Sequence, residues 1–228
     1  MKRTRASWLQ DVRRHLRDER LPVRSAAIEQ LARRGEAASL RLLVELLRDR
    51  RRSTWLRCEV AEALGRVRHR AVIPPLVDAL KDPEALIRLC AAESLGQLAA
   101  TEAVAPLTAL LRDADSLVRG YAADSLGKLG IDASVLRHAL ARERSPHARV
   151  RIVASLVRMG RNSPRALLHF LGARDYRVRC SAANLLAEVT PRRTKPATLA
   201  AIRARLATEP TPAARSSLEY AVRCLQRP

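Results

Sequence analysis

One pattern returns along the chain at a nearly constant interval, and it constrains the fold more than any other feature. In its fullest form an arginine is followed by small apolar residues, by a leucine seven positions on, and then by a glycine. The three fullest copies start at Arg57, Arg88 and Arg119, and each step between them is 31 residues. Shorter copies start at Arg24, Arg149, Arg179 and Arg215. Such a period is typical of stacked helical repeats.

Each repeat contains two segments with the spacing of an amphipathic helix. The arginine segment is followed by a second apolar segment, which covers residues 71–80 in one repeat and 103–111 in the next. Apolar residues recur at intervals of three and four in both segments. Prolines fall in the first turn of the second segments, where a missing N–H costs nothing. Gly65, Gly96 and Gly127 are expected at the tight turn that ends each first helix.

The repeat resembles the HEAT repeat, in particular the short form named after phycobilisome lyases. The motif is an aspartate, four residues, Val or Ile, Arg, two residues, Ala-Ala, two residues and Leu-Gly, met most fully by residues 82–96 and 113–127. The resemblance implies an all-α fold, an α-solenoid that forms a right-handed superhelix of about six helix pairs with half-repeat caps. We therefore expect one solenoid over residues 1–228. Residues 1–17 would form an N-terminal capping helix, 18–208 about six helix pairs, and 209–228 a C-terminal capping helix.

The resemblance also implies a structural role for the repeated arginines. In the family, aspartates at the turns between repeats pair with such arginines in a ladder that links successive repeats. Bidentate arginine–carboxylate pairs suit that role. The ladder residues expected here are Asp18, Arg24, Asp49, Arg57, Asp82, Arg88, Asp113, Arg119, Glu143, Arg149, Asp175 and Arg179.

The net charge is +20, from 43 basic and 23 acidic residues. Residues 1–81 carry +10 and residues 128–228 carry +14, whereas residues 82–127 carry −4. This excess favours an acidic partner, either a protein or a nucleic acid. The alternative is compositional, because only four of the basic residues are lysines and a GC-rich genome enriches arginine.

Many of the remaining basic residues fall in the turns between first and second helices. Because such turns stack along one edge of a solenoid, we expect a basic rim that contacts the partner. The rim consists of Arg33, Arg34, Arg66, Arg68, Arg70, Lys128, Arg158, Arg161, Arg192, Arg193 and Lys195. A rim of this kind could follow a phosphate backbone without reading sequence. Few aromatic side chains are present to stack on bases, and the acidic middle would repel a polyanion.

Three groups of enzymes with HEAT-like repeats offer alternative functions for this chain. Deoxyhypusine hydroxylases hold iron through His-Glu pairs, and none of the five histidines here is followed by Glu. HEAT-like alkylpurine DNA glycosylases use aromatic and carboxylate side chains that this sequence does not visibly cluster. Bilin lyases share the short repeat, but no distinctive catalytic constellation appears. The sequence therefore favours a protein without catalytic residues or cofactor.

The four cysteines lie far apart and form no Cys-x-x-Cys pair, so disulfides and a metal centre are not expected. No apolar run has the length of a membrane span, and the basic start leads into Trp8 rather than a signal-peptide core. We expect a monomeric cytoplasmic scaffold that binds an acidic protein or peptide. Sequence-nonspecific nucleic-acid binding is the alternative function.

Overall fold

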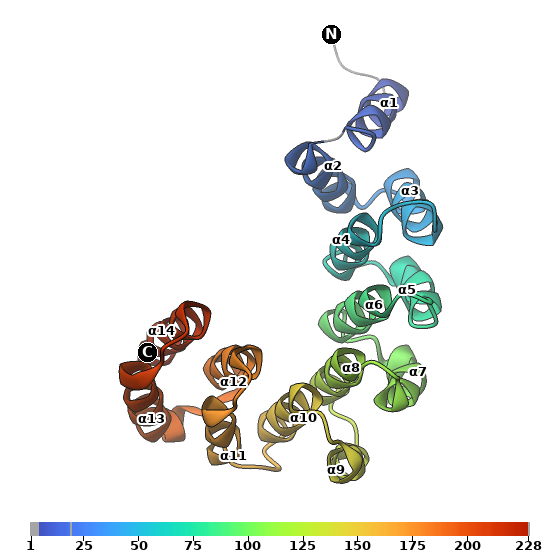
Figure 1. Cartoon of the computed structure of the whole chain (residues 1–228). Helices are drawn as coiled ribbons and strands as arrows, with labels where there is room; N and C mark the ends of the chain where they lie inside the picture. The colour runs from blue at the N-terminus through green and yellow to red at the C-terminus, as the bar shows by residue number, and fades with distance from the viewer. Residues whose placement is uncertain (1–4, 19, 228) are drawn as a thin grey trace. The chain divides into compact units, whose positions relative to one another are not determined.

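The computed structural model describes residues 5–18 and 20–227, and every regular element among them is helical (Figure 1). This agrees with the all-α solenoid expected from the repeat. The first four residues of the expected N-terminal cap lie outside the described part of the chain. The chain divides into two compact units, Met1–Ala100 and Thr101–Pro228, and each is described by itself.

The first unit is a succession of antiparallel helix pairs with one further helix at its start. Helices α2, α4 and α6 follow one another, and α3 packs on α2 and α4 while α5 packs on α6 and α3. Helix α1 packs on α2. The elements are α1 (Arg5–His15), α2 (Leu21–Arg34), α3 (Ala37–Arg48), α4 (Thr54–Gly65), η1 (Arg70–Val72), α5 (Ile73–Ala79) and α6 (Ala85–Gln97).

The second unit repeats this plan, and α14 is its last described helix. Helices α8, α10, α12 and α14 pack in sequence, and α7, α9, α11 and α13 pack against them. The first half contains η2 (Thr101–Ala103), α7 (Val104–Ala109), η3 (Leu110–Arg112), α8 (Ser116–Lys128), α9 (Ala133–Arg142) and α10 (Pro146–Arg158). The second half contains α11 (Arg165–Leu168), η4 (His169–Gly172), α12 (Tyr176–Val189), η5 (Arg192–Thr194), α13 (Lys195–Thr208) and α14 (Pro212–Gln226).

Local sequence fixes where many of these helices begin. Asp115, Asp132 and Asp175 cap α8, α9 and α12 by accepting hydrogen bonds from backbone amides of the first turn. Proline occupies the first turn of α2, α5, α10, α13 and α14. Both devices satisfy or remove amides that a helix start would leave unpaired.

The glycines at the ends of the first helices have a different role from the one expected. Gly65, Gly96 and Gly127 are helical, and the left-handed glycines that follow helices are Gly35, Gly130 and Gly160. A Cβ at residue 65 would lie 2.9 Å from the Ser94 Cα, and one at residue 127 would lie 2.7 Å from the Ser155 Cβ. Gly65 and Gly127 are therefore required for the close approach of successive first helices, and the turn expectation was wrong for them.

The buried side chains of both units are mostly aliphatic. In the second unit Val150, Leu167, Val178, Leu186 and Ile202 belong to one buried cluster that also includes residues of α14. Small residues such as Ala182 and Ala183 are fully buried between helices. A core of Leu, Val and Ala keeps helices close and explains why so few aromatic residues are needed. No helix in the described residues is long and apolar enough to cross a bilayer.

The expectation of unpaired cysteines was wrong for two of the four. Cys58 on α4 and Cys90 on α6 form a disulfide, with a Cα–Cα distance of 5.6 Å. Their separation of 32 residues is one repeat plus one residue, so both fall on the facing sides of neighbouring first helices. Cys180 and Cys224 are free. The sequence held a signal for this disulfide, because the spacing of Cys58 and Cys90 nearly equals the repeat period.

Candidate partner-binding site

Arginine–carboxylate pairs join successive repeats within each unit. Arg57 donates to both carboxylate oxygens of Asp82 and to the carbonyl of Leu47, and both side chains of the ion pair are buried. Arg119 pairs with Glu143 in the same way, at 2.7 and 2.9 Å. Each arginine therefore contacts the acidic residue of the following repeat.

Pairing with arginine lowers the pKa of these carboxylates. Burial opposes ionisation of Asp82, but hydrogen bonds from Arg57 and from the Glu84 amide outweigh it, so the Asp82 pKa lies below its ordinary value. The hydrogen bond from Arg119 likewise lowers the pKa of Glu143. Both groups thus remain ionised and hold the arginines in place.

The last pair joins Arg179 to Glu209, which the sequence analysis did not assign. Arg179 donates to the two carboxylate oxygens at 2.9 and 2.7 Å, and Glu209 is fully buried. Hydrogen bonding from Arg179 lowers the pKa of Glu209 from 4.5 to about 2. Glu209 lies six residues before Arg215, the same spacing as Asp82 before Arg88. The register of the repeat could therefore have identified Glu209 as a ladder residue.

Asp175 does not occupy the ladder position assigned to it. The residue six before Arg179 is Ala173, and Asp175 instead caps α12 and accepts a hydrogen bond from His147 at 3.0 Å. Arg149 donates to the carbonyls of Leu140 and Glu143. The alanine breaks the ladder at this step because it offers no carboxylate.

The other expected ladder residues make local contacts. Arg24 donates to the Asp18 carbonyl and Arg88 to the Asp82 carbonyl, each six residues back. The carboxylates of Asp49 and Asp113 accept backbone amides two residues on. Asp18 also pairs with Arg20. These contacts fix the turn that precedes each first helix.

Much of the expected rim is paired with other groups of the protein. Arg33 and Arg66 both contact Glu29, at 3.1 and 3.0 Å. The guanidinium of Arg34 lies over the Trp8 ring, 3.8 Å from its centroid. These contacts reduce the charge that the first unit's turns offer to a partner.

The same holds for the second unit. Lys128 and Arg158 both pair with the buried carboxylate of Asp124, at 2.9 and 2.7 Å, and Arg158 also reaches Glu188. Burial raises the pKa of Asp124, but the charges of Lys128 and Arg158 outweigh it and lower the pKa overall. Lys195 donates to the Arg227 carbonyl. Arg158 therefore joins α10 to α8 and α12, whereas Lys128 pairs within α8, and neither side chain is a free ligand.

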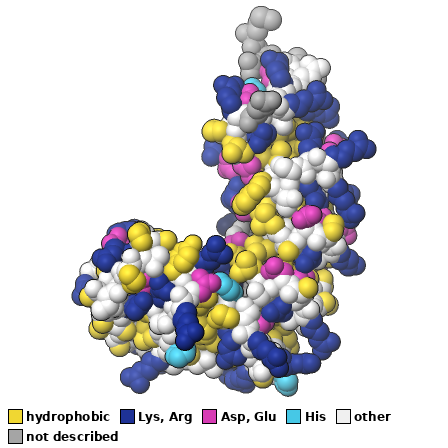
Figure 2. Space-filling model, viewed as in Figure 1, with side chains coloured by type: hydrophobic (Ala, Val, Ile, Leu, Met, Phe, Trp, Pro, Cys, Tyr) yellow, Lys and Arg dark blue, Asp and Glu magenta, His cyan; other side chains and the backbone are white. Residues whose placement is uncertain are grey.

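The remaining rim residues are exposed. They are Arg68, Arg70, Arg161, Arg192 and Arg193. Figure 2 shows basic side chains dispersed among acidic and apolar ones on the face in view. Arg68 and Arg70 of the first unit, and Arg161, Arg192 and Arg193 of the second, are therefore the exposed basic positions of the expected rim.

The second unit contains a cleft that the sequence analysis did not find. Its volume is about 720 Å³, and it lies between the α7–η3 segment and α9. Leu111, Val135 and Ala139 supply half-buried apolar surface. The cleft is also lined by Thr108, Arg112, Asp113, Arg119, His138, Arg142, Glu143 and Arg144.

The arginines of the cleft differ in what they contact. Arg119 is committed to Glu143, whereas Arg112, Arg142 and Arg144 are exposed. Among the described residues, no ion pair or side-chain hydrogen bond joins these three to a carboxylate. The cleft therefore combines apolar surface with unneutralised guanidinium groups. It escaped the sequence analysis because residues 112 and 142–144 converge only through helix packing.

Part of this architecture is also found in a known protein family. A family model described as HEAT repeats matches residues 50–127. This segment consists of HEAT repeats. The match agrees with the resemblance drawn from the arginine motif, and the rest of the chain has the same helix-pair architecture. No curated protein matches the chain.

Several solved structures share the fold over almost their whole length. The complex of CpcE and CpcF of phycocyanin lyase from Nostoc sp. PCC7120 has a TM-score of 0.63 at 18% identity, covering 94% of this chain and 93% of that chain. The Escherichia coli protein YibA has a TM-score of 0.58 at 17% identity, with coverage of 100% and 99%. Human deoxyhypusine hydroxylase has a TM-score of 0.53 at 21% identity, with 96% of each chain covered. At these identities the likeness shows the HEAT-like fold alone.

Proposed function

We propose that the protein is a non-enzymatic scaffold that binds an acidic peptide segment of another protein. The observation that carries the proposal is the cleft of the second unit, where Arg112, Arg142 and Arg144 surround the apolar side chains of Leu111 and Val135. HEAT repeats supply extended surfaces suited to such contacts.

The chemistry of the cleft favours carboxylates next to aliphatic side chains. Guanidinium groups bind carboxylates through two parallel hydrogen bonds and are weakly hydrated, so they pair readily at interfaces. Apolar surface between them would bury a leucine or similar side chain of the partner. The ligand that fits both features is a peptide that alternates Asp or Glu with Leu, Ile or Val.

The distribution of charge supports a peptide over a nucleic acid. A phosphate backbone requires several free cations in a row, and Arg66, Lys128 and Arg158 are instead paired within the protein. The exposed aromatic side chains Trp55, Tyr176 and Tyr220 lie outside the residues that line the cleft. Stacking of bases on Trp or Tyr side chains would therefore contribute nothing at this site.

The proposal is tested with a fluorescein-labelled peptide of alternating acidic and aliphatic residues, titrated by fluorescence anisotropy at several salt concentrations. We expect the double substitution Arg142→Ser with Arg144→Ser to weaken binding at least about a hundredfold, because each lost charge-assisted contact costs roughly 1.5 kcal/mol. The matched control is Arg192→Ser with Arg193→Ser, which removes the same charge from exposed positions outside the cleft.

Two outcomes would contradict the proposal. Equal losses in the two double variants would mean that net charge alone attracts the peptide. Tighter binding of duplex DNA or RNA than of the peptide, with a steep salt dependence, would instead identify a nucleic-acid-binding protein.

A further inference from the structure

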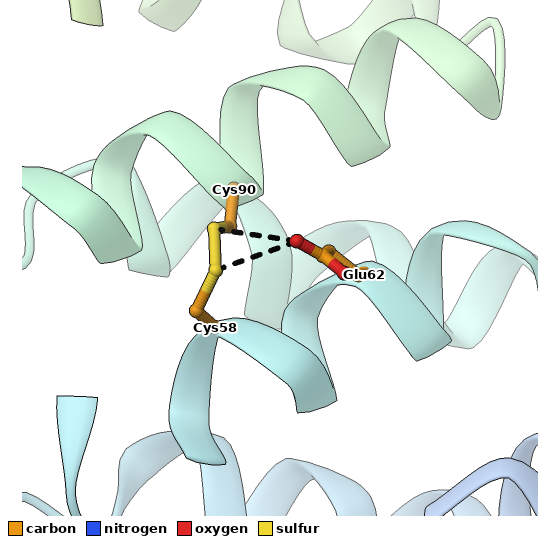
Figure 3. Close-up of side chains that lie close together, drawn as sticks. All are labelled: Cys58, Glu62 and Cys90. Atoms are coloured by element: carbon orange, nitrogen blue, oxygen red, sulfur yellow. Dashed lines mark hydrogen bonds between the residues drawn. A yellow bond between two sulfur atoms is a disulfide. The ribbon is translucent and has the colours of Figure 1, made fainter. Parts of the chain in front are cut away.

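The disulfide of the first unit has a carboxylate beside it. Glu62 lies one helical turn after Cys58 on α4, and its Oε1 is 3.6 Å from the Cys58 Sγ and 4.0 Å from the Cys90 Sγ (Figure 3). Both cysteines are buried, whereas Glu62 is exposed. One potential ligand atom of each residue lies within 4.8 Å of the other two.

This placement of Glu62 has no favourable interaction with an intact disulfide. Disulfide sulfur atoms carry no proton to donate, and their lone pairs face those of the carboxylate. In the dithiol state the S–H groups can donate to Glu62, and thiolates can share a cation with it. The position of the Glu62 carboxylate beside the two sulfur atoms therefore indicates a function for the reduced cysteines.

We propose that Cys58, Cys90 and Glu62 bind a thiophilic divalent cation of the Zn²⁺ class when the two cysteines are reduced. Two thiolates and one carboxylate provide three of the four ligands of a tetrahedral zinc ion, and water completes the shell on the exposed side of Glu62. Sulfur ligands select against Mg²⁺ and Ca²⁺, which prefer oxygen.

Coordination of the metal releases two protons and leaves the complex with a net charge of −1. Each thiol releases its proton when it coordinates, so two thiolates and the Glu62 carboxylate contribute three negative charges to a dication. Arg57 is adjacent to Cys58 in the chain but is committed to Asp82 and does not compete for these ligands. Metal affinity should therefore fall as pH falls and the thiols retain their protons.

Metal binding and the disulfide exclude each other. Oxidation removes two protons and two electrons from the thiols, and an acceptor such as oxidised glutathione takes them up to become two thiols. The resulting disulfide sulfurs are neutral and no longer offer thiolate ligands. The same two cysteines thus hold either a covalent link between α4 and α6 or a metal ion.

The experiment uses the full chain, reduced with a phosphine and freed of reductant without oxygen, and titrated with Zn²⁺ in competition with a chromophoric chelator. We expect one equivalent of Zn²⁺ to bind. Glu62→Gln, an exposed substitution that should leave the fold intact, should weaken binding by more than the roughly 10- to 100-fold that loss of an outer-shell partner costs. Cys58→Ser should abolish it, and Cys180→Ser is the matched control because Cys180 lies in the other unit.

Co²⁺ provides a second readout, since thiolate coordination gives an intense charge-transfer band. The band should appear with the reduced wild-type protein and vanish in Cys58→Ser and after reoxidation. Absence of binding to the reduced wild-type protein would overturn the proposal. So would undiminished binding to Cys58→Ser, to Glu62→Gln or to the oxidised protein.

Discussion

The Arg179 guanidinium clamps the Glu209 carboxylate through two hydrogen bonds of 2.9 and 2.7 Å, and the carboxylate is completely buried. Arg205 donates to the same carboxylate at 2.8 Å. The pair links α12 to the turn that precedes α14. Removal of one partner would leave a buried charge without compensation.

We therefore expect Glu209→Gln to lower the free energy of unfolding of the second unit by about 3 to 5 kcal/mol. The measurement is urea unfolding followed by the helical circular dichroism signal. Glu188→Gln is the matched control, because Glu188 pairs with Arg158 from an exposed position, where an ion pair contributes about 0 to 1 kcal/mol. A similar loss in both variants would contradict a special role for the buried pair.

The same carboxylate should make stability depend on pH. Because Arg179 lowers the pKa of Glu209 from 4.5 to about 2, the stabilisation is complete above pH 4.5 and is lost as pH falls toward 2. We expect the melting temperature of the wild-type protein to fall more than that of Glu209→Gln over this range, so that the two curves converge. Parallel curves would show that Glu209 does not titrate with a depressed pKa.

Gly127 should not tolerate a methyl group. The added Cβ would lie 2.7 Å from the Ser155 Cβ and 3.2 Å from its Cα, and the overpacking costs about 1 to 3 kcal/mol. This outweighs the gain of about 0.5 to 1 kcal/mol that alanine brings to a helix interior. We expect Gly127→Ala to be destabilised and Ser155→Gly to restore part of the loss in the double variant. The measurement is thermal unfolding of each variant. Gly172→Ala is the control, because no atom lies within 4 Å of its new Cβ.

Reduction of the disulfide should destabilise the first unit. The cross-link closes a loop of 32 residues, for which the chain-entropy relation gives about 3 to 4 kcal/mol. Tryptophan fluorescence reports this unit, since both tryptophans lie within it. We expect reduction to lower the urea midpoint of the wild-type protein and to leave Cys58→Ser unchanged. A reductant effect of equal size in Cys58→Ser would point to another cause.

The sequence alone determined the helix pairs and their register. Arg57, Arg88 and Arg119 recur every 31 residues, and helical periodicity in the intervening segments leaves stacked helix pairs as the way to bury the apolar faces. The pairing of the repeated arginines with acidic residues at the turns was also a prediction from sequence. It identified the kind of partner correctly for Arg57 and Arg119, and missed Glu209 because Pro210 and Pro212 obscured the last repeat.

Tertiary structure decided which groups meet across helices. Gly65 faces Ser94 of α6 and Gly127 faces Ser155 of α10, Cys58 faces Cys90, and Arg158 of α10 pairs with Asp124 of α8. The cleft likewise forms from η3 and α9, whose arginines are 30 residues apart at positions 112 and 142. A repeat pattern fixes the position of each residue along its helix. The direction in which neighbouring helices pack selects which of those side chains touch, and that depends on the shapes and charges of all the residues between them.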